Sequence, residues 1–396
     1  MDWQLASGYR FAGVHSGLRA SEPGRLDLAL VVSDRPARVA GAFTQNRVRA
    51  APVRVCQERL PARDVRGVVI CSGNANACTG EQGLRDAYRM AEVAAGLAAC
   101  KAEQMLVCST GVIGRLLPMQ IIEPGIAAAA RELADGPRAF DNAARAILTT
   151  DTRIKVATRR VPCGDQTITL TGFAKGAAMI GPNLATMLAF VLTDAAVEPA
   201  HLGKLAPEAC ARSFNSVSVE GHTSTNDTVL IFCNGTGAAL AGQALAAFDE
   251  AVTGVCQDLA REIAADAEGA NHLVTIEVDG LRSEEEARKV AKTVADSALV
   301  KTAIFGADPN WGRFVSAAGY SGVEFAEKDL SLWQGEMQLY KDGVPLPFDE
   351  KAASAYLKDN REITLRFRFN LGQARCTFWT CDLTYEYVKL NADYTT

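Results

Sequence analysis

The stretch KGAAMIGPNLATML, residues 175–188, sets a single threonine, Thr186, in an otherwise apolar and glycine-rich run. Two interpretations follow from the residues alone. Either Thr186 is an ordinary strand residue at the head of the apolar run 187–195, or its hydroxyl is a nucleophile. A threonine hydroxyl needs a base beside it to react, and cutting the chain before the threonine frees an amine that is such a base. Pro182 stiffens the approach to this bond, and Ala185 leaves its carbonyl open to attack.

Apolar periodicity on both sides of this stretch predicts alternating strands and helices. The run 187–195 is too short for a secure helix and favours a buried strand. The longest helix is predicted at 244–267, with Gly269 as a C-terminal stop. Two further strands, at 215–221 and 227–235, are expected to pair across a polar loop. The remaining predictions are strands at 66–71, 104–114 and 166–176 and helices at 83–100 and 138–148.

The last third of the chain changes character. Residues 283–297 predict an amphipathic helix whose acids precede its bases, the order that the helix dipole favours. From about 329 onward, the runs 330–343, 362–372 and 374–396 resemble strands separated by turns. We therefore expect a main domain at 1–280 and a smaller C-terminal α+β lobe at 281–396.

The composition argues against several classes of protein. The chain has 396 residues, 48% of them hydrophobic, which is enough for a large core. Its 41 basic and 46 acidic residues give a net charge of −5, without a basic tract that would hold nucleic acid. The N-terminal residues lack the pattern of a signal peptide, and no run approaches 18 apolar residues. A soluble cytoplasmic protein is expected.

Cysteine and histidine usage bears on disulfides, metals and thiol chemistry. The eleven cysteines are an odd number in a long chain and lie mostly in apolar strands, which favours free, buried, reduced thiols. Cys71 and Cys108 are alternative nucleophiles, but no histidine lies in a context that marks it as their partner. The four histidines are scattered and no CxxC occurs, while the glycines match neither a P-loop nor a dinucleotide fingerprint. No metal and no tightly bound cofactor is expected.

Several blocks of the sequence resemble one family, the ornithine acetyltransferases, also called ArgJ-type bifunctional glutamate N-acetyltransferases. The run AKGAAMIGPNLATMLAFVLTDA closely resembles that family's signature. The resemblance covers nearly the whole chain. The other blocks occur in the family's order: SGNANACTG (72–80), STGVIGRLLPM (109–119), AILTTDT (146–152), SFNSVSVEGHTSTND (213–227), DAEGAN (266–271), VKTAIFGADPNWGR (300–313) and the terminal LNADYTT.

The resemblance implies self-cleavage between Ala185 and Thr186, which gives parts 1–185 and 186–396, with Thr186 as the acyl-carrying nucleophile. It also implies that Thr110 and Gly111 hold the oxyanion of the tetrahedral intermediate. Without the resemblance, Thr110 and Gly111 also fit a turn, and Lys175 also fits a solvated lysine. In the same way, Thr149 also fits a helix cap and Glu268 a helix-end acid. The substrate-binding positions implied besides Thr186 are Lys175, Thr149 with Thr150 as the neighbouring alternative, Glu268, Asn391 and Thr396.

By the same resemblance, the protein transfers acetyl from N2-acetyl-L-ornithine to L-glutamate in arginine biosynthesis. Two half-reactions through one covalent intermediate predict ping-pong kinetics. Acetyl-CoA is a second donor in bifunctional members. The implied fold is a layered αββα sandwich with a smaller C-terminal lobe, and the cleaved parts are expected to form an α2β2 assembly. The implied partners are small-molecule substrates, without nucleic acid or membrane.

The sequence departs from the family's pattern at three places, of which Leu184 in place of a frequent methionine is a volume-conserving change of little consequence. Glu220 and His222 replace acids of the block DGDTSTND, and Asn271-His272 replaces a threonine-lysine pair. A different acyl donor or acceptor therefore remains an alternative. So does a self-cleaving aminopeptidase that passes its acyl group to water, and so does a non-enzymatic small-molecule binding protein that kept the fold.

Overall fold

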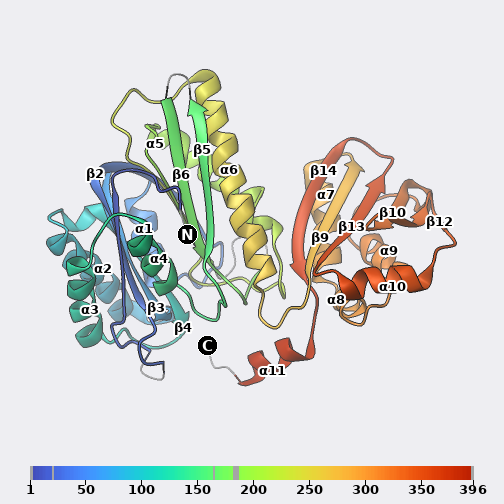
Figure 1. Ribbon diagram of the computed structural model, residues 1–396, viewed down its shortest axis with the longest axis horizontal. Coiled ribbons are helices and arrows are strands. Elements are labelled where there is room, and N and C mark those ends of the chain that lie inside the picture. Colours follow the sequence, from blue (N-terminus) through green and yellow to red (C-terminus); the bar gives the residue numbers. More distant parts are fainter. Residues whose placement is uncertain (1–2, 20–21, 164–165, 182–186, 394–396) are drawn as a thin grey trace.

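The computed structural model describes residues 3–19, 22–163, 166–181 and 187–393 (Figure 1). A large mixed sheet has the strand order β4-β3-β2-β8-β7-β6-β5, with β1 paired to β2. Its strands are β1 (Tyr9–Val14), β2 (Leu28–Phe43), β3 (Ala62–Asn74), β4 (Met105–Val112), β5 (Lys155–Cys163), β6 (Gln166–Lys175), β7 (Leu188–Thr193) and β8 (Thr228–Cys233).

The long strand β2 belongs to both halves of this sheet. Its first half pairs with β1 and β3, and its second half, from Arg38 to Phe43, pairs with β8. The register with β3 shifts between Val32 and Val39, and such irregularities bend a strand. The sheet therefore forms two layers, β1–β4 and β5–β8, joined through β2.

The two layers face each other across an apolar core. Phe11 of β1 packs edge-on against Phe140 of helix α4 (Pro137–Ala146), with ring centroids 5.2 Å apart. Phe140 packs in turn against Phe173 of β6 at 5.5 Å, and Phe173 stacks on Phe190 of β7 at 4.9 Å. All four rings are buried, and such pairs add to the stability that burial alone gives. Helix α4 thus connects the two layers.

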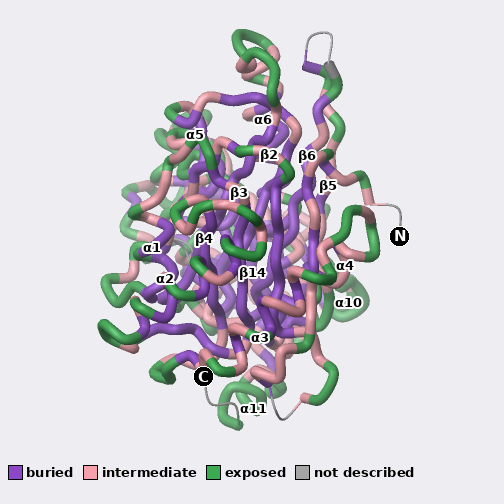
Figure 2. Tube along the Cα trace, turned by 90° about the vertical axis from the view of Figure 1, so that its left-hand side faces the viewer, coloured by how far each residue is buried: buried purple, intermediate pink, exposed green. Residues whose placement is uncertain are grey.

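Helices cover the outer face of each layer. Helices α2 (Gly80–Leu97) and α3 (Met119–Arg131) pack on β1–β4. On the other layer, α6 (Gly242–Ala265) packs on β5–β7, and α5 (Pro199–Ala211) packs on β8 and on β2. Strand β7 illustrates this layering, because successive residues of the strand belong alternately to the core between the two layers and to the core under α5 and α6. The predicted αββα sandwich is confirmed, and Figure 2 shows its buried strands. Helix α1 (Ala51–Arg59) packs beside β4 and α2.

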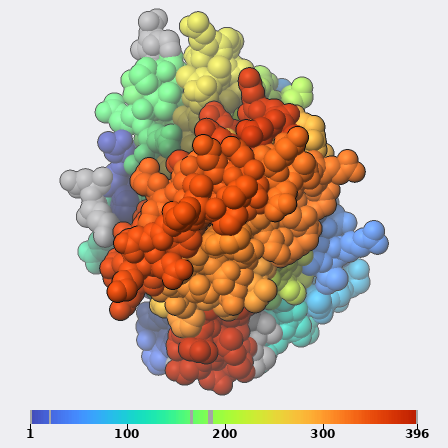
Figure 3. All heavy atoms as spheres, turned by 90° about the vertical axis from the view of Figure 1, so that its right-hand side faces the viewer, coloured from blue at the N-terminus to red at the C-terminus, as the bar shows by residue number. Residues whose placement is uncertain are grey.

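The second sheet forms the C-terminal lobe, which fills the face shown in Figure 3. Its order is β12-β11-β10-β13-β9-β14, and helices α7 to α9 share one apolar core with it. The expected boundary near residue 280 falls at the end of β9. The elements are β9 (Leu273–Leu281), α7 (Glu284–Asp296), α8 (Ala298–Phe305), α9 (Trp311–Gly319), β10 (Leu330–Gln334), β11 (Met337–Lys341), β12 (Val344–Pro345), α10 (Glu350–Asp359), β13 (Glu362–Phe369), β14 (Ala374–Cys381) and α11 (Tyr385–Asp393).

Most of the predicted elements are confirmed to within a few residues. The run 187–195 contains the buried strand β7, and 244–267 contains α6, which ends at Ala265. Gly269 lies beyond the helix in a left-handed conformation, with φ +67°. Among the described residues, no helix is long and apolar enough to cross a membrane.

The predicted strand at 215–221 is wrong. β8 already has β2 on one edge and β7 on the other, so no edge is left for a hairpin partner. The backbone N–H of Ser218 instead donates to the carbonyl of Trp379, and that of Val219 donates to the carbonyl of Ile180. This segment therefore connects the two lobes instead of extending the larger sheet.

The predicted strand at 374–396 is correct only for its first part, which is β14. Residues Tyr385–Asp393 form helix α11, none of whose residues is buried. The Thr384 hydroxyl accepts the backbone N–H of Tyr387 at 3.1 Å, which provides the N-terminal cap that starts this helix.

Candidate active site

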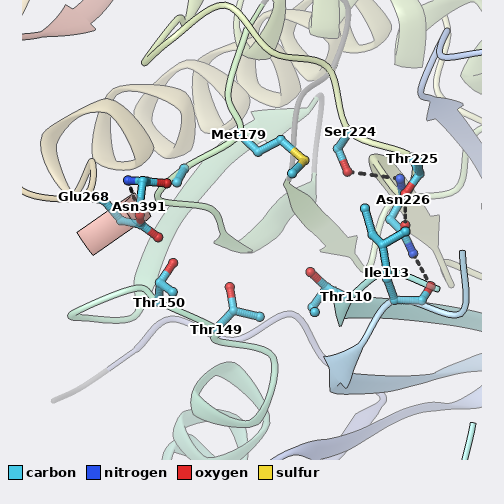
Figure 4. A pocket seen from close by; sticks show the side chains of 13 residues that line it. Thr110, Ile113, Thr149, Thr150, Met179, Ser224, Thr225, Asn226, Glu268 and Asn391 are labelled. Atoms are coloured by element: carbon cyan, nitrogen blue, oxygen red, sulfur yellow. Dashed lines mark hydrogen bonds between the residues drawn. The ribbon is translucent and has the colours of Figure 1, made fainter. Parts of the chain in front are cut away.

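A cavity of about 140 Å³ lies where loops of the sandwich meet helix α11 (Figure 4). One water needs roughly 10–15 Å³ on this measure, so the cavity has room for about ten waters or a small metabolite. Segments from distant parts of the chain line it together. Six of the predicted site residues are among those segments: Thr110, Gly111, Thr149, Thr150, Glu268 and Asn391.

Thr110 and Gly111 lie at the end of β4, where it runs parallel to β3. Gly111 has φ +130°, and a Cβ atom there would lie 2.3 Å from the carbonyl carbon of Gly73. Glycine is therefore required both by the backbone conformation and by the close approach of β3. Figure 4 shows the Thr110 side chain at the cavity wall. A hydroxyl beside a glycine N–H offers the two donor types that an oxyanion hole uses.

Lys175 ends β6 directly behind this wall. Its side chain is buried, and its Nζ lies 3.4 Å from Thr110 Oγ1. Burial lowers the pKa of the Lys175 ammonium, and the Asp151 carboxylate opposes that shift. The alternative of a solvated lysine is thus excluded. β6 pairs with β7 so that Lys175 lies opposite Leu188, the first residue of that strand.

Thr149 and Thr150 lie in the loop between α4 and β5, and both line the cavity. The Leu148 carbonyl before them accepts a hydrogen bond of 2.9 Å from Arg19 Nη2. The backbone N–H of Thr149 donates to Asp151 Oδ2 at 3.0 Å. Backbone contacts therefore hold this loop, and the two threonine side chains in Figure 4 remain available to a ligand.

Glu268 and Asn391 form the opposite side of the cavity. The Glu268 backbone N–H donates to the carbonyl of Ala177 at 2.9 Å, and Asn391 Nδ2 donates to Glu268 Oε2 at 3.1 Å. Helix α11 approaches closely, because a Cβ on Gly269 would lie 2.5 Å from the Tyr387 nitrogen. The left-handed Gly269 therefore brings Asn391, from the far end of the chain, to the cavity.

The segment from Ser224 to Asn226 also lines the cavity, and the sequence did not predict this. Asn226 Nδ2 donates to the carbonyls of Ala75 and Ser109, at 2.6 and 2.8 Å. This side chain therefore connects the ends of β3 and β4 to the residues just before β8, at the cavity wall (Figure 4). The block SFNSVSVEGHTSTND resembles the family, but the spacing of its residues does not indicate which of them line the cavity.

Ala185, Thr186 and Thr396 lie outside the described residues. The described residues on either side of 182–186 are Gly181 and Met187, both buried. The Ile180 carbonyl accepts the backbone N–H of Val219 at 2.8 Å, and the Met187 N–H donates to Asp227 Oδ1 at 3.1 Å. Residues of the single segment 219–227 thus contact the chain both before and after the predicted cleavage site.

Asp227 is buried in this region. Its second oxygen, Oδ2, has no hydrogen-bond partner among the described residues. Burial raises the pKa of Asp227 to about 7, although the Met187 N–H and the Lys175 charge act in the opposite direction. A carboxyl group that exchanges a proton near neutral pH therefore lies beside Met187.

The departures from the family pattern that fall on described residues lie away from the cavity wall. Neither Glu220 nor His222 lines it, and His222 is exposed. Burial raises the pKa of Glu220 to about 7. His272 Nδ1 lies 2.8 Å from Asp382 Oδ2, in the C-terminal lobe's connection to α6. Glu220, His222, Asn271 and His272 therefore have no direct contact with the cavity as it is lined by the described residues.

The alternative thiol nucleophiles are not among the residues that line this cavity. All eleven cysteines are free, and eight of them are buried, as the sequence predicted for most of them. Cys71 and Cys108 do not line the cavity, and burial raises the pKa of Cys71 to about 12. A buried thiol of that pKa is protonated at neutral pH and unreactive. Within the described part of the chain, no group of three His, Cys, Asp or Glu side chains is arranged to hold a metal.

Comparison with known proteins decides the family. The model of the ArgJ family matches residues 10–396. The chain belongs to the ArgJ family. The arginine biosynthesis bifunctional protein ArgJ of Symbiobacterium thermophilum is 45% identical over 394 residues, which are 98% of this chain and 97% of that relative. ArgJ of Caldanaerobacter subterraneus is 44% identical over 401 residues, 99% of this chain and 98% of the relative.

A solved ArgJ structure supports the same conclusion. The crystal structure of arginine biosynthesis bifunctional protein argJ from Bacillus halodurans superimposes with a TM-score of 0.50 at 40% identity. It covers 52% of this chain and 98% of that chain. The resemblance drawn from the sequence blocks is therefore confirmed, and the αββα sandwich is the fold of an ArgJ family member.

Proposed function

We propose that this chain is an N-acyltransferase that moves acetyl from N2-acetyl-L-ornithine to L-glutamate in arginine biosynthesis. One observation carries the proposal: the cavity gathers Thr110, Gly111, Thr149, Glu268 and Asn391 in a chain of the ArgJ family. The relatives are named arginine biosynthesis bifunctional proteins, after the same pathway. The cavity's size suits an amino acid or its acetyl derivative.

The proposed chemistry begins with self-cleavage. The Thr186 hydroxyl attacks the Ala185 carbonyl, the acyl group moves from nitrogen to oxygen, and water hydrolyses the ester. This frees the Thr186 amine, which then takes the proton of the same hydroxyl. In the proposal, the two parts are 1–185 and 186–396.

Two half-reactions follow in the proposed mechanism. Thr186 Oγ attacks the acetyl carbonyl of N-acetylornithine, the amide C–N bond breaks, and the departing ornithine nitrogen takes up the proton. The glutamate amine then attacks the acetyl ester, and the Thr186 oxygen leaves and regains its proton. Thr110 and Gly111 are proposed to stabilise the oxyanion in both steps, and the loss of one such donor typically costs about 3 kcal/mol of barrier.

The charged groups are proposed to orient the substrate. Glu268 suits an ammonium group of ornithine, because an ionised pair is stronger than a neutral hydrogen bond. Asn391 Nδ2 already donates to Glu268, which fixes that carboxylate at the cavity. Thr149 or Thr150, Lys175 and Thr396 are proposed as further substrate contacts, with Lys175 supplying a positive charge behind Thr110.

The decisive experiment is intact-mass analysis of the native protein and of Thr186→Ala, before and after addition of N-acetylornithine. We expect two fragments for the native protein, one full-length chain for the variant, and an added acetyl mass only on the fragment 186–396. Fragments that carry no adduct would contradict the transferase. Acetate release without glutamate would instead favour an amidohydrolase.

Several finer features belong to this proposal. We propose that the two cleaved parts assemble as α2β2, that the enzyme acts in the cytoplasm, and that the C-terminal lobe, expected at 281–396 and including β9 (Leu273–Leu281) as well, completes the site of the main domain. Acetyl-CoA as a second donor is proposed from the relatives' description as bifunctional. Size-exclusion chromatography with light scattering tests the assembly, and an assay with acetyl-CoA and glutamate tests the second donor.

A further inference from the structure

A buried ion cluster lies next to the cavity without lining it. Lys155 is the first residue of β5, and its Nζ lies 2.6 Å from Asp151 Oδ1 and 2.6 Å from Asp266 Oδ2. The side chains of Lys155 and Asp151 are fully buried, and that of Asp266 is 4% exposed. Buried charges are costly unless they are paired. We therefore expect the Lys155 ammonium and the two carboxylates to keep these contacts.

Asp151 connects Lys155 to two segments that line or back the cavity. Its Oδ2 accepts the backbone N–H of Thr149 at 3.0 Å, and its Oδ1 accepts the backbone N–H of Gly176 at 2.6 Å. Burial acts to raise the pKa of Asp151, but Lys155 and Lys175 outweigh it and hold the pKa below its ordinary value. Asp151 is therefore a carboxylate that binds the loop 149–152 to the end of β6.

Asp266 connects Lys155 to a third segment. It follows the last residue of α6 and lies two residues before Glu268. Its Oδ2 accepts the backbone N–H of Thr152 at 3.1 Å, and its Oδ1 accepts the Thr152 hydroxyl. One ammonium group thus joins the threonine loop, the strand end that carries Lys175 and the helix end that carries Glu268.

We propose that Lys155 is a positioning residue for substrate binding, which fixes Thr149, Thr150 and Glu268 around one cavity through Asp151 and Asp266. This inference rests on the proposed function. The cluster reaches Thr110 indirectly, through Lys175, whereas it binds the segments that carry Thr149, Thr150 and Glu268 by direct hydrogen bonds and by their own chain. We therefore expect Lys155 to affect the binding of the substrate more than the stabilisation of the oxyanion.

Replacement of Lys155 tests this directly. Lys155→Met keeps a long unbranched side chain and removes its charged end, leaving two carboxylates without their shared partner. We expect the Kd for L-ornithine and the KM for N-acetylornithine to rise by about tenfold, with kcat within about threefold of wild type. The backbone amides of Thr149, Thr152 and Gly176 should exchange their hydrogens faster, because their acceptors are no longer held.

The matched control is an exposed ion pair that also involves β5 and lies between β5 and α6. Arg159 of β5 and Asp258 of α6 are 2.8 Å apart, with 40% and 53% of their side chains exposed. Arg159→Met should leave Kd, KM and the three exchange rates unchanged. If Lys155→Met does not fold, Lys155→Met with Asp266→Asn removes one positive and one negative charge together and serves as the test, with the same expected loss of binding.

Opposite outcomes would overturn the inference. A folded Lys155 variant whose Kd and KM stay within twofold of wild type would show that the cluster only stabilises the fold. A wild-type protein that neither binds ornithine nor transfers acetyl would refute the proposed function instead. In that case amide exchange alone decides, and unchanged exchange at Thr149, Thr152 and Gly176 overturns the positioning role.

Discussion

Gly111 meets two structural demands at one residue, a left-handed backbone and a close approach to Gly73. Gly111→Ala should therefore lower the free energy of unfolding by about 3 kcal/mol, because alanine is strained at this φ and the backbone of β3 must also move away from the new Cβ. Gly114, three residues on, has φ +81° but no atom within 4 Å of a Cβ.

Gly114→Ala is accordingly the control and should cost only about 1 kcal/mol. Chemical denaturation in a Thr186→Ala background, which is expected to keep the chain in one piece, measures both variants. Equal losses for Gly111→Ala and Gly114→Ala would contradict the close approach of β3 and β4.

Asp227 makes stability depend on pH. Its pKa is raised to about 7 in the folded protein from an ordinary value of 3.8, so the folded state binds a proton that the unfolded chain has released. The free energy of unfolding should therefore fall as pH rises from about 4 to about 7. Asp227→Asn keeps an acceptor for the Met187 N–H and should reduce this fall by about 2–4 kcal/mol.

Denaturant titrations at pH 5 and pH 8 measure that difference, again in the Thr186→Ala background. Glu220, whose pKa is also raised to about 7, contributes a parallel slope that Asp227→Asn leaves in place. If Asp227→Asn leaves the difference in the free energy of unfolding between pH 5 and pH 8 unchanged, Asp227 is already ionised in the folded protein at pH 5, and the prediction is wrong.

At the scale of elements, helix α11 brings its end to the cavity while burying none of its residues. Asn391→Ala should raise the KM for N-acetylornithine about fivefold, because Glu268 loses the donor that orients its carboxylate. Lys389→Ala, on the same helix and paired with the exposed Glu386, is the control and should leave KM unchanged. Similar effects from both variants would indicate a general loss of helix α11.

The sequence could predict those elements whose local apolar pattern matches the way that they are buried and paired in the fold. The apolar run of β7 is buried on both faces, and the pattern was sufficient for it. At 215–221 the two valines are buried, as they would be in a strand, since Val217 and Val219 are each 2% exposed. Their backbone partners lie in Trp379 and Ile180, and no local pattern contains that information. Asn226 was missed for the same reason, because its partners are carbonyls far away in the chain.

At the scale of the whole molecule, the predicted cut falls between two neighbouring strands. β7 and β8 follow the cut, yet they lie between β2 and β6, which precede it. The two parts should therefore remain together after cleavage and coelute in size-exclusion chromatography without denaturant. Separate elution of 1–185 and 186–396 under native conditions would contradict this sheet order.

The same strand order has a consequence for how the protein can be made. If 1–185 and 186–396 were produced from two separate genes, the first product would expose the edges of β2 and β6 where β8 and β7 belong. Open strand edges of this kind recruit other chains and aggregate. Continuous synthesis followed by scission lets every edge find its partner before the peptide bond is lost.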